Sequence, residues 1–406
     1  MNIIQISGGV TAPKGFKASG VHCGIRKNKT KKDLALIVAD NTCSAAAVYT
    51  QNLVQGAPIT VTKENISDGF AKAVICNSGN ANTCNSDGIE KAESMCRLAA
   101  EALGIAPSDI VIASTGVIGQ TFPIEPIENG MAELVSELSY DGGADAAEAI
   151  LTTDTAAKEA AVSFELDGRT CVIGGMCKGS GMIHPNMATM LGFLTTDAAI
   201  SPSLLDQALH EAVALSFNMV SVDGDTSTND MVSILASGCA GNRKITDKNE
   251  NYDVFSAALT DVCIILAKKV AKDGEGATKL LECKVLGAKD ELSAKAISKS
   301  VICSSLVKSA FFGADANWGR ILCAIGYSGQ EVNIQAVDVC LSSSAGSIKV
   351  CENGAGVPFC EETAKKILLK DEILIDITLH DGLASACAWG CDLTYDYVKI
   401  NGDYRT

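Results

Sequence analysis

Short apolar runs rich in Val and Ile alternate along this chain with segments of helical periodicity, and this alternation restricts the possible folds more than any other feature. The predicted strands are residues 71–76 (AKAVIC), 110–113 (IVIA) and 170–174 (TCVIG), and each runs into a turn with Gly or Ser. The predicted helices are residues 88–103, 127–138, 203–216, 254–270 and 361–369. Because such elements bury their apolar faces by stacking, we expect an α/β protein of two layers or more.

Composition and charge exclude several classes of protein. The 406 residues include 33 Lys and Arg against 48 Asp and Glu, a formal net charge of −15, which argues against nucleic acid as a partner. The longest apolar run that we find, residues 262–267, is far shorter than the ~18 residues that span a bilayer. The sequence MNIIQISGGVTAPKGF has no basic start and only a four-residue apolar patch, so we expect no secretion signal here. We therefore expect a cytoplasmic protein that binds a small solute, with no membrane partner.

The cysteines do not form a recognisable framework. There are 17 of them, spread from Cys23 to Cys391 without a CxxC pair, and the four histidines show no metal-ligand spacing with them. Disulfide-rich domains are short and secreted, which this chain is not expected to be. We expect reduced thiols that pack as small hydrophobic groups, and no metal site.

The segment 178–197, KGSGMIHPNMATMLGFLTTD, contains the first candidate for chemistry. Thr189 has two interpretations: a buried strand residue that bonds its neighbour's backbone, or a nucleophile. A threonine nucleophile needs an adjacent base, and cleavage of the preceding peptide bond frees an α-amino group with a pKa of roughly 7.7–8.0. The small Ala188 and the turn before it suit such a cleavage, but spacing alone does not choose between the two interpretations.

A second candidate is Ser114–Thr115–Gly116, which directly follows a predicted strand. A strand that ends in this way presents a hydroxyl and backbone N–H groups, which suits an oxyanion, although a plain strand-to-turn transition fits equally well. Residues 273–279 (DGEGATK) do not match a P-loop, so nucleotide binding is not expected. Residues 223–230 (DGDTSTND) lack the closing Glu of a calcium loop and are predicted to form a solvated or hydrogen-bonded loop.

Together, the polar motifs resemble the ornithine acetyltransferase (glutamate N-acetyltransferase) family of arginine biosynthesis. They are NSGNAN at Asn77, STGVIG at Ser114, TTDT at Thr152, KGSGMIHPNMATML at Lys178, SVDGDTSTND at Ser221, DGEGATK at Asp273, ADANWGR at Ala314 and AWGCDLTYDYVKINGDYRT at Ala388. The resemblance extends over essentially the whole chain. It implies an αββα sandwich of the self-cleaving, N-terminal-nucleophile kind with a smaller second α/β lobe.

The resemblance also implies a self-processed enzyme. Cleavage between Ala188 and Thr189 would give an α chain of residues 1–188 and a β chain of residues 189–406, interleaved in one packed unit and assembled as an α2β2 heterotetramer. The implied reaction moves an acetyl group from N2-acetylornithine to glutamate through an acetyl-threonine ester. No cofactor is implied, and acetyl-CoA serves as a further co-substrate in bifunctional members of the family.

Residue roles follow from the same resemblance. Thr189 is the implied nucleophile, and the Thr115 hydroxyl and the Gly116 backbone N–H are the implied oxyanion donors. The implied substrate contacts are Thr152, Lys178, Thr189, Glu275, Asn401 and Thr406. The register between Thr152 and Thr153 stays open, and His184 is expected to be structural.

Two other functions remain to be distinguished from the transferase. One is a hydrolase, because aminopeptidases with an N-terminal Ser share the self-cleaving fold. The other is a metabolite-binding protein without catalysis, which would need neither cleavage nor an oxyanion turn. Assays of acetyl transfer against peptide hydrolysis, together with the mass of the purified polypeptides, separate the three.

Overall fold

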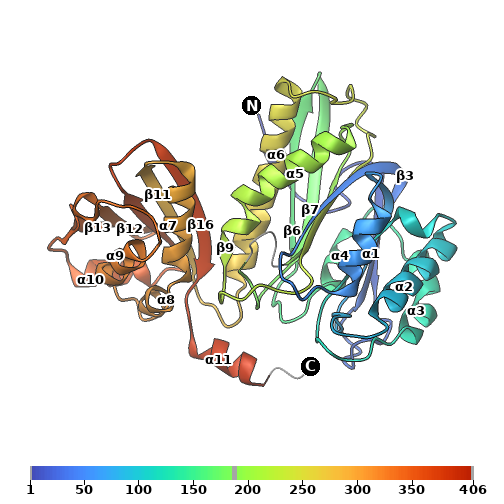
Figure 1. Cartoon of the computed structure of the whole chain (residues 1–406), viewed down its shortest axis with the longest axis horizontal. Coiled ribbons are helices and arrows are strands. Elements are labelled where there is room, and N and C mark those ends of the chain that lie inside the picture. The colour runs from blue at the N-terminus through green and yellow to red at the C-terminus, as the bar shows by residue number, and fades with distance from the viewer. Residues whose placement is uncertain (1, 185–189, 404–406) are drawn as a thin grey trace.

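The chain forms two lobes, each built on a β-sheet, in a computed structural model that describes residues 2–184 and 190–403 (Figure 1). The sheet of the larger lobe has nine strands in the order β1-β6-β7-β8-β10-β3-β4-β5, with β2 paired to β3. Its strands are β1 (Ile4–Ile6), β2 (Phe16–Val21), β3 (Leu34–Tyr49), β4 (Phe70–Asn77), β5 (Ile110–Ser114), β6 (Lys158–Leu166), β7 (Arg169–Lys178), β8 (Leu191–Thr196) and β10 (Met231–Ala236).

The larger lobe is a sandwich because β3 belongs to two layers. Its first part pairs with β2 and β4, its last part pairs with β10, and the register with β4 shifts between Val38 and Cys43. An irregularity of this kind bends a strand and lets the sheet fold over. Side chains of β3 alternate between two cores: Ile37 lies in the cluster between the sheet layers, and Leu36 lies in an outer cluster.

Helices cover both outer faces of this folded sheet. The helices of the larger lobe are α1 (Ala57–Asn65), α2 (Gly88–Leu103), α3 (Glu125–Ser136), α4 (Gly143–Ala149), α5 (Pro202–Leu215) and α6 (Glu250–Lys272). One outer core joins β4 and β5 to α2 and α3, for example through Ile75 and Met95. The other joins β6 to α6, where the rings of Phe164 and Phe255 meet edge to face at 6.2 Å. The predicted αββα sandwich is therefore confirmed.

The smaller lobe has a seven-stranded sheet in the order β14-β13-β12-β15-β11-β16-β9. Its strands are β9 (Val220–Ser221), β11 (Leu280–Ala288), β12 (Asp338–Ser343), β13 (Gly346–Glu352), β14 (Ala355–Gly356), β15 (Glu372–Thr378) and β16 (Ala384–Cys391). Its helices are α7 (Glu291–Cys303), α8 (Ser305–Phe312), α9 (Trp318–Gly326) and α10 (Glu361–Leu368). Helix α6 contacts strands of both sheets, so the two lobes share one buried core.

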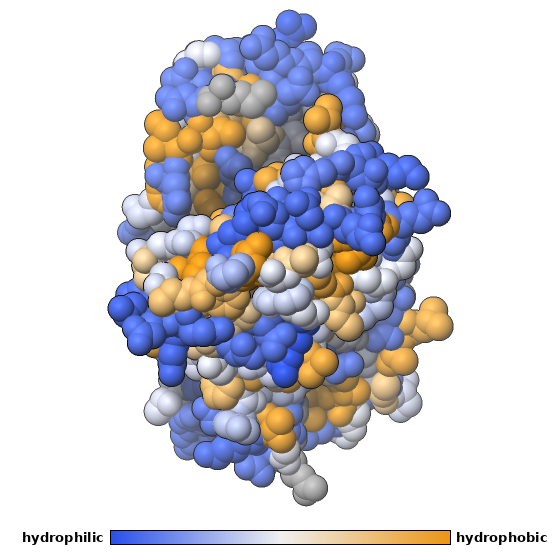
Figure 2. Space-filling model, turned by 90° about the vertical axis from the view of Figure 1, so that its left-hand side faces the viewer, coloured by the Kyte–Doolittle hydropathy of each residue, from blue (hydrophilic) through white to orange (hydrophobic). Residues whose placement is uncertain are grey.

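On the face of the molecule that Figure 2 shows, hydrophilic side chains alternate with apolar patches. The last helix, α11 (Tyr395–Gly402), leaves the smaller lobe after β16 and runs back beneath the larger lobe (Figure 1). No helix within residues 2–184 and 190–403 is long and apolar enough to cross a membrane.

The predicted elements are found with small shifts at their ends. The predicted helix 127–138 is α3, two residues earlier, and the predicted helix 254–270 is α6, which begins at Glu250. The side chain of Asn249 starts α6 by accepting a hydrogen bond from the backbone N–H of Tyr252 at 3.2 Å. Residues 250–252, at the end of the polar stretch 242–252, are therefore helical.

Strands from both sides of position 188/189 pair in one sheet. β7 ends at Lys178, β8 begins at Leu191, and β8 lies between β7 and β10. The predicted cleavage position therefore falls in a connection within the larger lobe and does not separate the two lobes. Ala188, Thr189 and Thr406 themselves lie outside the described residues.

Candidate active site

One cavity of about 330 Å³ brings the predicted site residues together. Its lining includes Thr115, Gly116, Thr152, Thr153, Lys178, Gly181, Ser227, Thr228, Asn229, Glu275 and Asn401. Every predicted site residue within the described ranges lines this cavity. Both Thr152 and Thr153 do so, which leaves the register between them open. The remaining predicted residues, Ala188, Thr189 and Thr406, are outside the part of the chain that the structure describes.

The Thr115–Gly116 turn offers two hydrogen-bond donors to the cavity. The backbone N–H of Thr115 is used, because it donates to the carbonyl of Asn77 at 3.0 Å. The Thr115 hydroxyl and the Gly116 N–H donate to no described residue. Gly116 has a φ of +134°, and a Cβ there would lie 2.3 Å from the carbonyl carbon of Gly79, so only glycine fits this turn.

Asn229 holds this turn in place from the opposite side. Its buried amide donates to the carbonyls of Ala81 at 2.6 Å and Ser114 at 3.0 Å, and it accepts from the Thr83 hydroxyl at 2.5 Å. The loop that carries Asn229 was predicted only as a solvated or hydrogen-bonded loop. The SVDGDTSTND motif was therefore a signal for site residues that sequence reasoning did not assign.

The same loop fixes the end of the Lys178–Gly181 turn. The carboxylate of Asp223 accepts hydrogen bonds from the backbone N–H groups of Met182 at 2.6 Å and Ile183 at 2.8 Å. Asp223 is thus used by the protein's own backbone. Within the residues that the structure describes, no group of His, Cys, Asp and Glu is arranged to hold a metal ion.

Glu275 lies against the Lys178–Gly181 turn and contacts the last helix. Its backbone N–H donates to the carbonyl of Ser180 at 3.0 Å, and its carboxylate accepts from the Asn401 side chain at 2.7 Å. A Cβ on Gly181 would lie 2.4 Å from the Glu275 carboxyl carbon, so the glycine makes this close approach possible. Only 7% of Glu275 is exposed, which leaves its carboxylate with little solvent and few partners.

Lys178 is a nearly buried cation without a bonded carboxylate. Only 8% of it is exposed, and its ammonium forms no hydrogen bond or ion pair with a described residue. The charge of Lys178 nevertheless affects Asp154. Burial would raise the pKa of Asp154, but Lys178 and Lys158 outweigh burial and hold that pKa well below its usual range. An ammonium in this position is suited to bind the carboxylate of a ligand.

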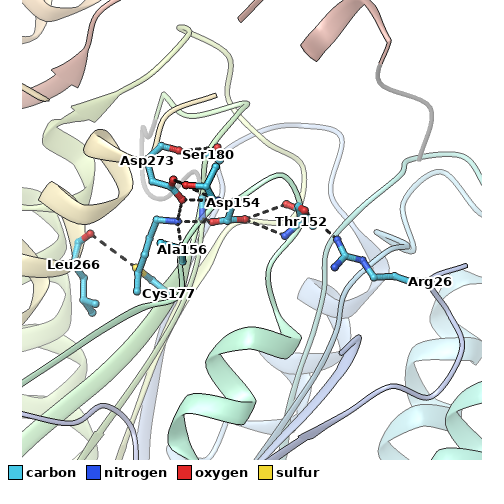
Figure 3. A network of polar contacts seen from close by, with 11 residues as sticks. Arg26, Thr152, Asp154, Ala156, Cys177, Ser180, Leu266 and Asp273 are labelled. Carbon is cyan, nitrogen blue, oxygen red and sulfur yellow. Dashed lines mark hydrogen bonds and ion pairs between the residues drawn. The ribbon is translucent and has the colours of Figure 1, made fainter. Parts of the chain in front are cut away.

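Asp154 fixes two of the predicted contact segments (Figure 3). Its carboxylate accepts hydrogen bonds from the backbone N–H of Thr152 at 3.0 Å and of Gly179 at 2.7 Å, and it pairs with Lys158 at 2.7 Å. The Arg26 guanidinium also contacts the first of these segments, because it donates a hydrogen bond to the carbonyl of Thr152 at 3.1 Å.

His184 lies next to side chains of the smaller lobe. Its Nδ1 is 3.1 Å from the Ser221 hydroxyl and 3.6 Å from the Cys303 thiol. Burial and the charge of Lys299 lower its pKa to about 4, so the imidazole is neutral near pH 7.

Known proteins match this chain along its whole length. A model of the ArgJ family matches residues 17–406. The arginine biosynthesis bifunctional protein ArgJ of Symbiobacterium thermophilum is 52% identical over 403 residues, which cover 99% of each chain. The protein of the same name from Bacillus subtilis is 49% identical over 406 residues, covering 100% of this chain and 98% of its own. A crystal structure of the bifunctional protein from Bacillus halodurans aligns with a TM-score of 0.50 and 47% identity, covering 52% of this chain and 98% of the crystal chain.

Proposed function

This chain belongs to the ArgJ family, and we propose that it transfers an acetyl group from N2-acetylornithine to glutamate by way of an acetyl ester on Thr189. The observation that carries this proposal is the cavity, where predicted site residues from both sides of position 188/189 meet. Its volume of about 330 Å³ is at the small end of ligand pockets, which suits an amino acid.

Cleavage between Ala188 and Thr189 supplies the base in this proposal. The freed α-amino group of Thr189 takes the proton from its own hydroxyl, so no separate histidine or carboxylate is needed. The Bacillus halodurans structure supports cleavage, because 98% of that crystal chain spans only 52% of this one, as a separated half would.

The two cleavage products remain together in the proposed enzyme. The product of residues 189–406 supplies β8 and β10, which lie between β7 and β3 of the other product. Separation would break the hydrogen bonds on both sides of these strands. Assembly as an α2β2 heterotetramer and a cytoplasmic location belong to the proposal through the family resemblance.

The acetyl transfer has two half-reactions. The Thr189 oxygen attacks the acetyl carbonyl carbon, the negative charge on the carbonyl oxygen is stabilised by the Thr115 hydroxyl and the Gly116 N–H, and ornithine leaves with the proton on its α-amine. Glutamate's α-amine then attacks the ester carbonyl, and the Thr189 oxygen regains its proton as N-acetylglutamate forms. Each oxyanion donor contributes ~2.7–4 kcal/mol to such a transition state.

Recognition must satisfy two substrates whose side chains have opposite charges. Both share an α-carboxylate, and Lys178 is the lysine at the cavity whose ammonium has no bonded partner among the described residues. We assign it to that carboxylate. Glu275, which accepts a hydrogen bond from Asn401, faces the cationic ornithine side chain. Thr152 also lines the cavity.

The mass of the purified protein tests the cleavage. Wild type should give two polypeptides divided after residue 188, and Thr189→Ala should give one. An uncut but active wild type would overturn the role of Thr189.

Product assays test the reaction class. N2-acetylornithine and glutamate together should give N-acetylglutamate, with no hydrolysis of peptides, whereas peptide hydrolysis without transfer would favour an aminopeptidase. The relatives are named bifunctional, and we extend the proposal to glutamate acetylation with acetyl-CoA alone as donor. No transfer from acetyl-CoA would restrict the enzyme to the first donor.

A further inference from the structure

A buried lysine next to the cavity joins three of the segments that line it. Lys158, at the start of β6, pairs with Asp154 at 2.7 Å and with Asp273 at 2.5 Å. Its side chain is 2% exposed, that of Asp154 is fully buried, and that of Asp273 is 12% exposed. Lys158 does not line the cavity and bears no role in the reaction proposed above.

Asp273 continues this network into the other predicted cleavage product. Its carboxylate accepts from the backbone N–H of Thr155 at 3.1 Å and from the Thr155 hydroxyl, and its carbonyl accepts from the Ser180 hydroxyl at 2.7 Å. Lys158 therefore connects the loop 152–155, the turn 178–181 and the loop that leads to Glu275. Two of these three segments precede position 188/189, and the loop that leads to Glu275 follows it.

The hydrogen bonds of Asp154 leave no room for a further donor. One carboxylate oxygen accepts from Lys158 and Gly179, both at 2.7 Å, and the other accepts from the Thr152 N–H at 3.0 Å and its hydroxyl at 3.4 Å. A carboxylate has about four acceptor positions, and all are used here. Lys178 precedes Gly179 directly, yet its ammonium bonds neither this carboxylate nor any other described one.

We propose that Lys158 is a positioning residue for substrate: by occupying an oxygen of Asp154, it prevents that carboxylate from pairing with Lys178 and so leaves the Lys178 ammonium for the α-carboxylate of the ligand. The inference rests on the function proposed above, in which Lys178 binds the carboxylate that both substrates share.

The charges of the network agree with this arrangement. Burial would lower the pKa of Lys158, but the adjacent Asp154 and Asp273 outweigh it and raise that pKa. Lys158 is therefore an ammonium between two carboxylates. Lys178 is then the cation whose charge a ligand must balance.

Replacing Lys158 by methionine tests the inference, because the unbranched side chain keeps most of its length but loses its charge and donors. Lys178 should then pair with Asp154, and each ligand must displace that pair. The affinities for ornithine and for glutamate should both fall by about tenfold or more, the size of a lost charge-assisted hydrogen bond. The KM values should rise in parallel, with kcat changed by less than threefold.

The double variant Lys158→Met/Asp154→Asn separates positioning from simple support. Without the Asp154 charge nothing competes for Lys178, so both affinities should be higher than in the single variant. Recovery is partial, because Asn has one acceptor oxygen and holds only one of the Thr152 and Gly179 N–H groups. If Lys158 only supported the fold, the double variant should bind more weakly than the single variant, because a second buried substitution would destabilise the protein further. The double variant also removes one of the two carboxylate charges that Lys158 balances, so it should fold even where the single variant does not. Affinities within about tenfold of wild type then support positioning, and a larger loss contradicts it.

Lys308 provides a matched control in the smaller lobe. It is also a buried lysine, 4% exposed, and it donates to the carbonyl of Cys391 without contacting the cavity. Lys308→Met should lower the melting temperature and leave both ligand affinities unchanged.

Calorimetric binding of ornithine and glutamate, intact mass and thermal melting are measured on the purified, full-length protein. The inference is overturned if Lys158→Met binds both ligands as wild type does, if the Lys308 control loses as much affinity, or if the double variant binds more weakly than the single one. Wild type that is cut but binds neither ligand overturns the inference together with the role of Lys178. Failure of the proposed function itself is separate, because it appears in wild type as absent cleavage and absent transfer.

Discussion

Replacing Gly116 by alanine tests the oxyanion assignment through the geometry of its turn. A Cβ at this position would lie 2.3 Å from the carbonyl carbon of Gly79 and 2.6 Å from the backbone nitrogen of Asn80. Both are main-chain atoms and cannot rotate away. The turn must therefore shift by about 1 Å to reach ordinary contact distance, and a displacement of that size is enough to impair catalysis. The Gly116 N–H moves with it.

The expected loss is that of one oxyanion donor. Such a loss costs ~2.7–4 kcal/mol in the transition state, or about 10²–10³-fold in kcat. Ornithine affinity should change much less, because ornithine has no acetyl oxygen for the Gly116 N–H to bind. The assay is the initial rate of N-acetylglutamate formation from N2-acetylornithine and glutamate, with intact mass to record cleavage.

Gly119 in the same turn provides the control. Its φ is +75°, and no atom lies within 4 Å of an added Cβ, so Gly119→Ala introduces the left-handed backbone penalty of roughly 1–2 kcal/mol without a clash. This variant should keep its kcat. The oxyanion assignment is refuted if Gly116→Ala keeps a kcat within threefold of wild type, or if both variants lose the same amount.

Three further substitutions test individual side chains. Thr115→Val should lower kcat by about 10²–10³-fold while Thr115→Ser keeps most of it, as steady-state rates will show; equal rates for the two variants would exclude the hydroxyl. Glu275→Gln should weaken ornithine binding about fivefold or more by calorimetry and leave glutamate binding equal or tighter, since a carboxylate opposite the side chain favours only the cation; equal losses for both ligands would contradict this role. The pKa of His184 falls from 6.5 to about 4 on folding, so the unfolded chain takes up the proton first and stability is lost as pH falls from 6.5 toward 4. His184→Asn should flatten urea-unfolding stability over that interval, and an unchanged slope would show that another group titrates there.

Local patterns were sufficient to predict part of the larger lobe: the strands β4, β5 and β7 and the helices α2, α3, α5 and α6. The periodicity of residues 88–103 gave α2 with its observed ends, because its apolar face, including Met95, packs on a single neighbouring layer. The caps were less predictable. Asp87 occupies the N-cap position but makes no capping hydrogen bond, and the helix ends at Gly104, which adopts the left-handed conformation.

Long-range pairing was not predictable from local patterns. The bend in β3 depends on which strands pair with each of its ends. Within the site, the motifs identified the cavity residues, but Asn229 and Lys158 were not assigned. Both are polar residues whose partners lie far away in sequence, such as Ala81 for Asn229 and Asp273 for Lys158.

The place of β8 between β7 and β10 has a kinetic consequence once the chain is cut. In the precursor these strands find one another within a single molecule, so refolding is first order. After cleavage they belong to two molecules, and recovery from denaturant becomes second order. Its rate then decreases as the protein concentration is lowered. The refolding yield of the cut enzyme should therefore decrease as the protein is diluted, while that of the Thr189→Ala precursor should not. The native enzyme would then be a state that each chain reaches efficiently only once, before its own cleavage.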